Sequence, residues 1–271
     1  SQYLYFDRFL NQRRGLLPSF FPSSEAEEEN LMVWLKFGSE RPMYALLVDK
    51  IPDLLPQGGS QCFPFYIYDE NGTNRRENIT DWVLEQFQTH YEDPTITKWD
   101  IFYYTYAILH HPHYRTRYAA NLKRELPRIP YAPEFRPFAT AGQRLADIHV
   151  NYEDQPEYPL KHLENKDLPI DWRVEKMRLS KDKTQLKYND FLTLTGIPPE
   201  VFEYRLGNRS ALDWVIDQYR IKTDKRSGIT NDPNRLDDEE YIVRLIKQVI
   251  TVSLETVKIV NALPDLGLPK D

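Results

Sequence analysis

The chain has 271 residues, a net charge of −6 and 41% hydrophobic residues. Its 18 Tyr and 13 Phe residues predict a core rich in aromatic side chains, many of which carry a polar hydroxyl group. This length accommodates two domains or one large one. No stretch approaches the roughly 18 apolar residues of a membrane span, and the opening SQYLYFDRFLNQRRG lacks a signal-peptide pattern. The single Cys62 excludes a disulfide framework, so we expect a cytoplasmic protein. A net-acidic chain can still carry a basic face, so nucleic-acid binding stays open.

The first half of the chain reads as strands followed by helices. Alternating or apolar runs predict strands at 31–37, 44–51 and 62–69, and Pro64 places the last of them at an edge or a bulge. Helical patterns follow at 79–91, 99–109, 114–126 and about 134–152, and the second of these is apolar on every side, as expected of a buried helix.

The second half begins with a polar, proline-containing segment, 153–171, which we expect to be a linker or surface excursion. Residues 172–180 and 184–190 alternate like a hairpin, and helices are predicted at about 198–205, 210–220 and 238–262. Irregular alternation of strands and helices predicts an α+β fold, with one lobe at 23–152 and a second, containing a basic loop at 222–235, at 172–271.

Enzyme signatures are weak. The sequence has no G-x-x-x-x-G-K-[ST] and no G-x-G-x-x-G loop. A metal-dependent nuclease or hydrolase would have to use His110 and His113 of HHPHY, or Glu157 and Glu164. Pro112 separates the two histidines, whose residue types equally suit a helix end, and Glu164-Asn165-Lys166 is a short match in a polar stretch. We keep metal chemistry as the alternative function.

The predicted helix 114–126 offers a row of cations. Arg117 and Arg124 are seven residues apart and share a face, which Arg128 extends, opposite the apolar stripe. Such a row can follow a phosphate backbone, although a solvated helix face has the same pattern.

The loop KTDKRSGITNDPNR, 222–235, concentrates Lys, Arg and Asn. Asp237 and Glu240 are spaced as a capping box for the following helix, so carboxylates would occupy the helix end that a bound phosphate needs. We therefore predict a long, flexible loop whose tips contact DNA, since Arg suits the O6/N7 edge of guanine and Asn the N6/N7 edge of adenine. Arg205 and Arg209 precede a helix that we expect Ser210 to cap.

Several long phrases resemble the C-terminal specificity region of type ISP single-chain, ATP-dependent restriction-modification enzymes. They are SQCFPFYIYD (60–69), HHPHYRTRYAANLKRELPRIP (110–130), WRVEKMRLSKDKT (172–184), YNDFLTLTGIPPEVFEYRLGNRSALDWVIDQYRIKTDKRSGITNDPN (188–234) and QVITVSLETVKIV (248–260). In that family a nuclease, a helicase-like motor and an adenine methyltransferase precede the target recognition domain. Residues 1–22 then correspond to the hand-over from the methyltransferase.

The resemblance implies sequence-specific recognition of double-stranded DNA on behalf of a linked N6-adenine methyltransferase and motor. The chain lacks a [DNS]-P-P-[YFW] motif, so we expect an excised piece without catalysis of its own. S-adenosylmethionine, ATP and Mg²⁺ are expected only in the linked domains. A purely structural module that couples those domains is a further alternative. The candidate DNA-contacting residues are Arg115, Arg117, Lys123, Arg124, Arg205, Arg209, Lys222, Lys225, Arg226, Asn231, Asn234 and Arg235.

Overall fold

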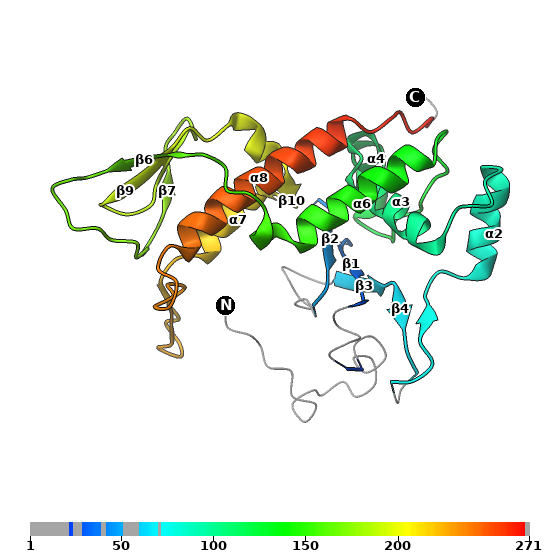
Figure 1. The fold of residues 1–271 in the computed structure, drawn as a ribbon, viewed down its shortest axis with the longest axis horizontal. Coiled ribbons are helices and arrows are strands. Elements are labelled where there is room, and N and C mark those ends of the chain that lie inside the picture. The colour runs from blue at the N-terminus through cyan, green and yellow to red at the C-terminus, as the bar shows by residue number, and fades with distance from the viewer. Residues whose placement is uncertain (1–21, 24–28, 39–41, 51–59, 70–71, 269–271) are drawn as a thin grey trace. The chain divides into compact units, whose positions relative to one another are not determined.

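A computed structural model describes residues 22–23, 29–38, 42–50, 60–69 and 72–268 (Figure 1). The chain divides into two compact units: unit 1 comprises Ser1–Val150 and Ile259–Asp271, and unit 2 comprises Asn151–Lys258. The mixture of helices with small antiparallel sheets confirms the predicted α+β class. The predicted hand-over segment, 1–22, lies outside the described residues except for Pro22.

Unit 1 contains a three-stranded antiparallel sheet. Its strands are β1 (Met32–Lys36), β2 (Tyr44–Val48) and β3 (Ser60–Pro64), in the order β2-β1-β3. Because β3 is an edge strand, the missing N–H of Pro64 removes no bond from the ladder, as the sequence predicted. The next residue, Phe65, leaves the strand, and a short hairpin of β4 (Tyr66–Ile67) and β5 (Arg76–Glu77) follows.

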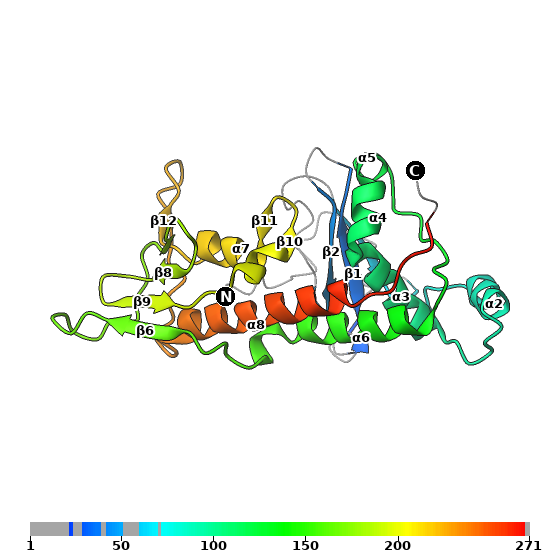
Figure 2. The ribbon, with the colours of Figure 1, turned by 90° about the horizontal axis from the view of Figure 1, so that it is seen from above.

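The described part of unit 1 contains the helices α2 (Asp81–His90), α3 (Lys98–His110), α4 (Pro112–Arg117), α5 (Ala119–Leu122) and α6 (Arg136–Val150). The apolar helix α3 is buried as predicted, and it lies beside α6 in both ribbon views (Figures 1 and 2). Their close approach depends on Gly142 of α6, because a Cβ atom there would lie 1.8 Å from the backbone oxygen of Tyr103. The glycine is therefore required by packing.

Buried aromatic side chains with satisfied hydroxyl groups form much of the core of unit 1. The Tyr106 hydroxyl accepts a hydrogen bond from the backbone N–H of Leu47 (2.9 Å) and lies 2.6 Å from Nδ1 of His149. The ring of His110 lies 5.5 Å from that of His149. Burial lowers the pKa of His110 to about 4 and that of His149 well below its usual range. The aromatic core with polar handles is thus present.

Unit 2 is built on a four-stranded antiparallel sheet of order β6-β9-β8-β7. The strands are β6 (Lys161–Glu164), β7 (Arg178–Leu179), β8 (Gln185–Lys187) and β9 (Leu192–Thr195). The segment 153–171, expected as a linker or surface excursion, contains a 3₁₀ turn (η1, Tyr152–Asp154) and contributes the edge strand β6. The predicted hairpin around residues 181–183 is present, although β7 is only two residues long.

After the sheet come a 3₁₀ turn η2 (Pro199–Glu203), a hairpin of β10 (Arg205–Leu206) and β11 (Arg209–Ser210), and helix α7 (Ala211–Gln218). A second hairpin of β12 (Lys222–Thr223) and β13 (Thr230–Asn231) leads to the long helix α8 (Tyr241–Asn261). The apolar face of α8 and the sheet share one core, which includes Leu186, Leu194, Leu212, Ile246 and Ile250.

Three local predictions were wrong. Helix 114–126 is in fact α4 and α5, separated at Tyr118, and the chain then turns back so that the Tyr114 hydroxyl donates to the Arg128 carbonyl (2.9 Å). The expected helix at 198–205 is the 3₁₀ turn η2. Helix α8 begins at Tyr241, so Asp237 lies before its first turn and does not form the predicted capping box with Glu240. By contrast, Ser210 caps α7, accepting from the N–H of Asp213 (3.0 Å) as expected.

Candidate nucleic-acid interface

Residues 222–231 of the basic segment 222–235 form a β-hairpin, here called the arm, which corrects the prediction of a flexible loop. Lys222 pairs with Asn231 and Thr223 with Thr230, and the two threonine hydroxyls lie 2.9 Å apart. One further bond, from the N–H of Asp224 to the carbonyl of Ile229 (2.9 Å), continues the ladder to the tip. The backbone of the arm is therefore held by cross-strand hydrogen bonds.

Asp224 organises the tip. Its carboxylate accepts hydrogen bonds from the backbone N–H groups of Ser227 (2.8 Å) and Arg226 (2.9 Å), and these bonds lower the pKa of the carboxyl group. Gly228 has a φ of +70°, a conformation that glycine adopts without strain, and its N–H donates to the Asp224 carbonyl (2.9 Å). The only carboxylate of residues 222–231 is thus used to shape the turn.

Asn234 and Asp232 anchor the base of the hairpin. The Asn234 side chain accepts from the N–H of Val174 and donates to its carbonyl, both at 2.8 Å. It also donates to Asp232 (2.7 Å), which lowers the pKa of that carboxyl group, and Asp232 pairs with Arg173 at 2.6 Å. Asn234, predicted as a DNA contact, therefore has most of its hydrogen-bonding capacity occupied within unit 2.

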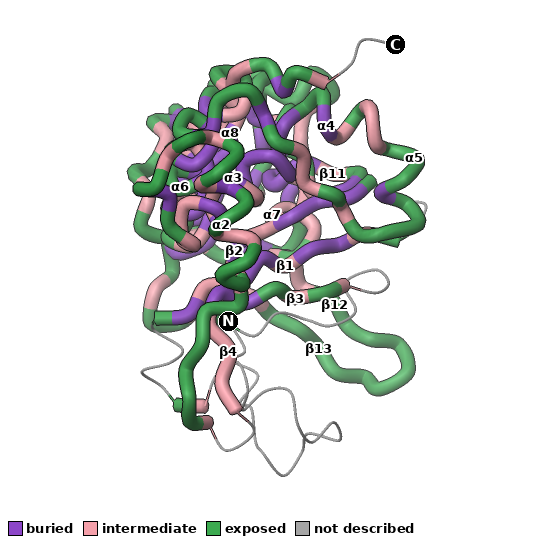
Figure 3. The backbone as a smooth tube through the Cα atoms, turned by 90° about the vertical axis from the view of Figure 1, so that its right-hand side faces the viewer, coloured by how far each residue is buried: buried purple, intermediate pink, exposed green. Residues whose placement is uncertain are grey.

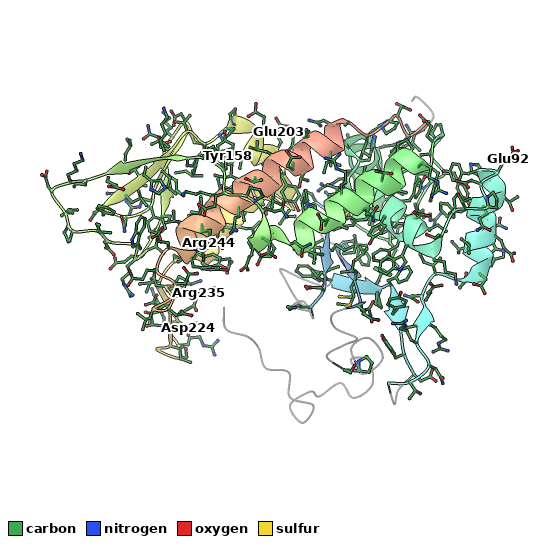
Figure 4. All side chains as sticks on the ribbon, viewed as in Figure 1. Glu92, Tyr158, Glu203, Asp224, Arg235 and Arg244 are labelled. Carbon is green, nitrogen blue, oxygen red and sulfur yellow. The ribbon has the colours of Figure 1, made fainter. Side chains whose placement is uncertain are left out.

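Arg235 stacks on the start of α8. Its guanidinium carbon lies 3.2 Å from the centroid of the Tyr241 ring, and the Tyr241 hydroxyl lies 3.3 Å from a carboxylate oxygen of Glu153. Figure 4 labels Arg235 at the base of the hairpin and Asp224 near its tip. The geometry makes Arg235 part of the support of the hairpin.

The remaining polar side chains of the hairpin face solvent. Lys222, Lys225, Arg226 and Asn231 are exposed, and their side chains form no hydrogen bond or ion pair with any described residue. Figure 3 shows β12, β13 and their turn as one continuous exposed arm. Three cations against one internally bonded carboxylate give this arm a local charge of +2 in an otherwise acidic chain.

The hairpin β10–β11 places Arg205 and Arg209 at the N-terminal end of α7, whereas β12 follows its C-terminal end (Figure 2). Arg205 donates to the carbonyl of Asn208 in the turn of its own hairpin. Arg209 pairs with Asp217 (3.0 Å) and lies 5.1 Å from the Trp214 ring centroid. Arg205 is exposed, while Arg209 is half-buried and mainly supports α7.

The other predicted contacts belong to unit 1. Arg115 donates to the carbonyl of Met43 (2.7 Å) and is half-buried. Arg117 lies in α4, whereas Lys123 and Arg124 lie beyond the end of α5. Because the predicted single helix is broken, Arg117 and Arg124 do not form a stripe along one helix, and that prediction was wrong.

A polar hollow of about 380 Å³ beside the hairpin base contains cations that sequence reasoning overlooked. Lys176 and Arg178 are exposed there without an ion pair to any described residue, while Arg173 is paired with Asp232 and Lys187 with Asp190. The signal was available in RVEKMRL, where cations alternate with the buried Val174 and Met177. Near the arm, these are further candidates for phosphate contacts.

The residues proposed for metal chemistry do not converge. His110 is buried with Nδ1 2.9 Å from the Tyr106 carbonyl, His113 is exposed on α4, and Glu157 pairs with Lys247 at 3.1 Å. Among the described residues, no group of three or more His, Cys, Asp or Glu side chains could hold a metal ion. Nor does this part of the chain contain a helix with the length and hydropathy needed to cross a membrane.

Comparisons with known proteins assign the family. The model of the Type ISP C-terminal specificity domain matches residues 1–246. Similar solved structures are a nuclease-deletion mutant of the Type ISP restriction-modification enzyme LlaGI in complex with a DNA substrate mimic (33% identity, TM-score 0.81), the ATP-dependent Type ISP enzyme LlaBIII bound to DNA (33%, 0.85), and a DrdV–DNA complex (38%, 0.85). They align with 98%, 98% and 97% of this chain, which covers only 24%, 18% and 27% of theirs. No curated protein matches the sequence. This chain belongs to the family of Type ISP C-terminal specificity domains.

Proposed function

We propose that the chain recognises a specific sequence in double-stranded DNA and directs a linked N6-adenine methyltransferase and helicase-like motor to it. The observation that carries the proposal is the basic arm of residues 222–231. It is a hydrogen-bonded and exposed hairpin, and its side chains are of the types that contact bases and phosphates. The relatives named above were solved with DNA, which supports the same partner for this chain.

In this proposal the chain binds and positions DNA, and has no catalytic step of its own. S-adenosylmethionine, ATP and Mg²⁺ would be held by the linked domains, and the enzyme would act in the cytoplasm, where its DNA lies. Flipping of the target adenine would occur in the methyltransferase, while the chain holds the flanking duplex.

Within the arm, the free cations have different expected roles. Lys ammonium groups act as point charges and suit phosphates, whereas the planar guanidinium of Arg226 can bridge O6 and N7 of guanine. Lys225 and Arg226 sit at the tip, and Lys222 lies on the first strand. We therefore assign phosphate contacts to Lys222 and Lys225, and direct base contact to Arg226.

The test compares Arg226→Ala and Arg226→Lys on cognate and scrambled duplexes, with the complete enzyme and with salt varied. A base reader loses about 1–3 kcal/mol on the cognate duplex alone in both variants, because lysine lacks the two-pronged donor geometry. A phosphate contact loses affinity equally on both duplexes in Arg226→Ala, reduces the salt dependence by about one ion, and is largely restored by lysine.

If neither variant changes binding to either duplex, Arg226 does not contact DNA, and its assignment as a base reader fails. Arg235→Ala serves as the matched control. Its side chain is engaged with Tyr241, so it should change stability and leave the ratio of cognate to scrambled affinity unchanged.

A further inference from the structure

One apolar side chain on the basic arm has no packing partner that explains it. Ile229, directly before β13, is 69% exposed, although its backbone is fixed by the bond to Asp224. A single exposed apolar residue is common in proteins and by itself carries no inference. The side chains that share its face decide what this one can do.

The register of the hairpin determines that face. Side chains of a strand alternate between the two faces, and directly opposed residues share a face. The pairs Lys222–Asn231 and Asp224–Ile229 therefore lie on one face, and the pair Thr223–Thr230 lies on the other. The 2.9 Å contact between the two threonine hydroxyls agrees with this assignment.

The face that carries Ile229 thus presents three chemically different groups. Lys222 supplies a cation, Asn231 a free carboxamide, and Ile229 a branched hydrocarbon, while Asp224 is turned into the tip. The other face presents only the two paired hydroxyls. Ile229 and Asn231 are two residues apart along one strand, a separation of about 6.7 Å.

A two-stranded ribbon fits the major groove of B-DNA, where thymine displays its 5-methyl group and adenine its N6/N7 edge. We propose, on the basis of the proposed function, that Ile229 packs on a thymine 5-methyl group while Asn231 pairs with an adenine. Because base pairs are stacked about 3.4 Å apart, the strand spacing corresponds to about two base steps. The recognised site then contains a thymine about two base pairs from an adenine read by the same face.

Uracil substitution isolates the methyl group, since it replaces a single CH₃ by hydrogen and keeps base pairing. Affinities of the complete enzyme, wild type and Ile229→Ala, are measured on cognate duplexes in which each thymine in turn is replaced by uracil. At one position the wild type should lose about three- to five-fold in affinity, as expected for one buried methyl group. Ile229→Ala should bind the thymine duplex more weakly and lose nothing further on the uracil duplex at that position.

A second arm tests the partner residue. Replacing the adenine about two base steps away by 7-deazaadenine removes the N7 acceptor. The affinity of the wild type should then fall by about five-fold or more, whereas the affinity of Asn231→Ala should not change. Thr223→Val, on the opposite face, keeps a β-branched side chain and is the matched control. It should retain the full wild-type sensitivity to both modified bases.

The inference is overturned if the effects of Ile229→Ala and of every uracil substitution on the binding free energy are additive, because the Ile229 side chain then contacts no thymine methyl group. It is also overturned if 2-aminopurine placed in the site brightens on wild-type binding and stays dark with Ile229→Ala. That result would make Ile229 a wedge between bases. If the wild type binds the unmodified cognate duplex no more tightly than a scrambled duplex, the proposed function itself fails. This outcome differs from the two above, in which the wild type still prefers the cognate duplex.

Discussion

Replacing Asn234 by alanine should loosen the hairpin from the sheet of unit 2 without removing a DNA contact. The substitution deletes two 2.8 Å hydrogen bonds to the backbone of Val174, a residue that is fully buried (0% exposed). Leaving a buried donor or acceptor unpaired costs about 1–3 kcal/mol each. The bond to Asp232 is exposed and adds little. We expect a loss of about 2–4 kcal/mol in the free energy of unfolding of unit 2.

Urea denaturation measures the loss, and hydrogen exchange locates it, because the Val174 amide loses its acceptor and should exchange faster. Asn231→Ala is the matched control. It removes the same side chain from an exposed position without partners and should change stability by no more than about 0.5 kcal/mol. If Asn234→Ala keeps wild-type stability and slow Val174 exchange, yet loses cognate DNA binding, then Asn234 contacts DNA and the anchoring argument is refuted.

Three other predictions concern the supports of the two units. Gly142→Ala should lower the unfolding free energy by about 1–3 kcal/mol or more, measured in urea, because the added Cβ would force α3 and α6 apart; unchanged stability would contradict the packing. Burial holds the folded-state pKa of His110 at about 4 and that of His149 well below its usual range. As the pH falls below about 6.5, the unfolded chain therefore binds protons first, and stability should fall by up to about 1.4 kcal/mol per pH unit per histidine; the slope should diminish in His149→Gln. Arg235→Ala should lose about 0.5–2 kcal/mol of stability in thermal or urea unfolding, since its cation–π contact is removed, and a neutral effect would show that the stack contributes nothing.

Local sequence patterns determined most elements of this protein. The apolar run of α3 must be buried, and Pro64 must lie where its missing N–H leaves no gap in the strand pairing. Ser210 and Asp213 form the cap that begins α7. These features could be predicted because each depends on residues close together in the sequence. The phrases that resemble the Type ISP specificity region also pointed to the family, which the family model over residues 1–246 confirms.

Only the tertiary structure decided which basic and amide side chains lie exposed without a partner among the described residues. Asn231 and Asn234 look equivalent in the sequence, yet one is free and the other is bonded to Val174, sixty positions away. The same holds for Arg226, which is free, and Arg235, which is stacked on Tyr241. The expected arginine stripe failed because the predicted helix is broken at Tyr118 and α5 ends before Lys123. A side chain's partners come from distant segments, and composition and periodicity contain no information about that pairing.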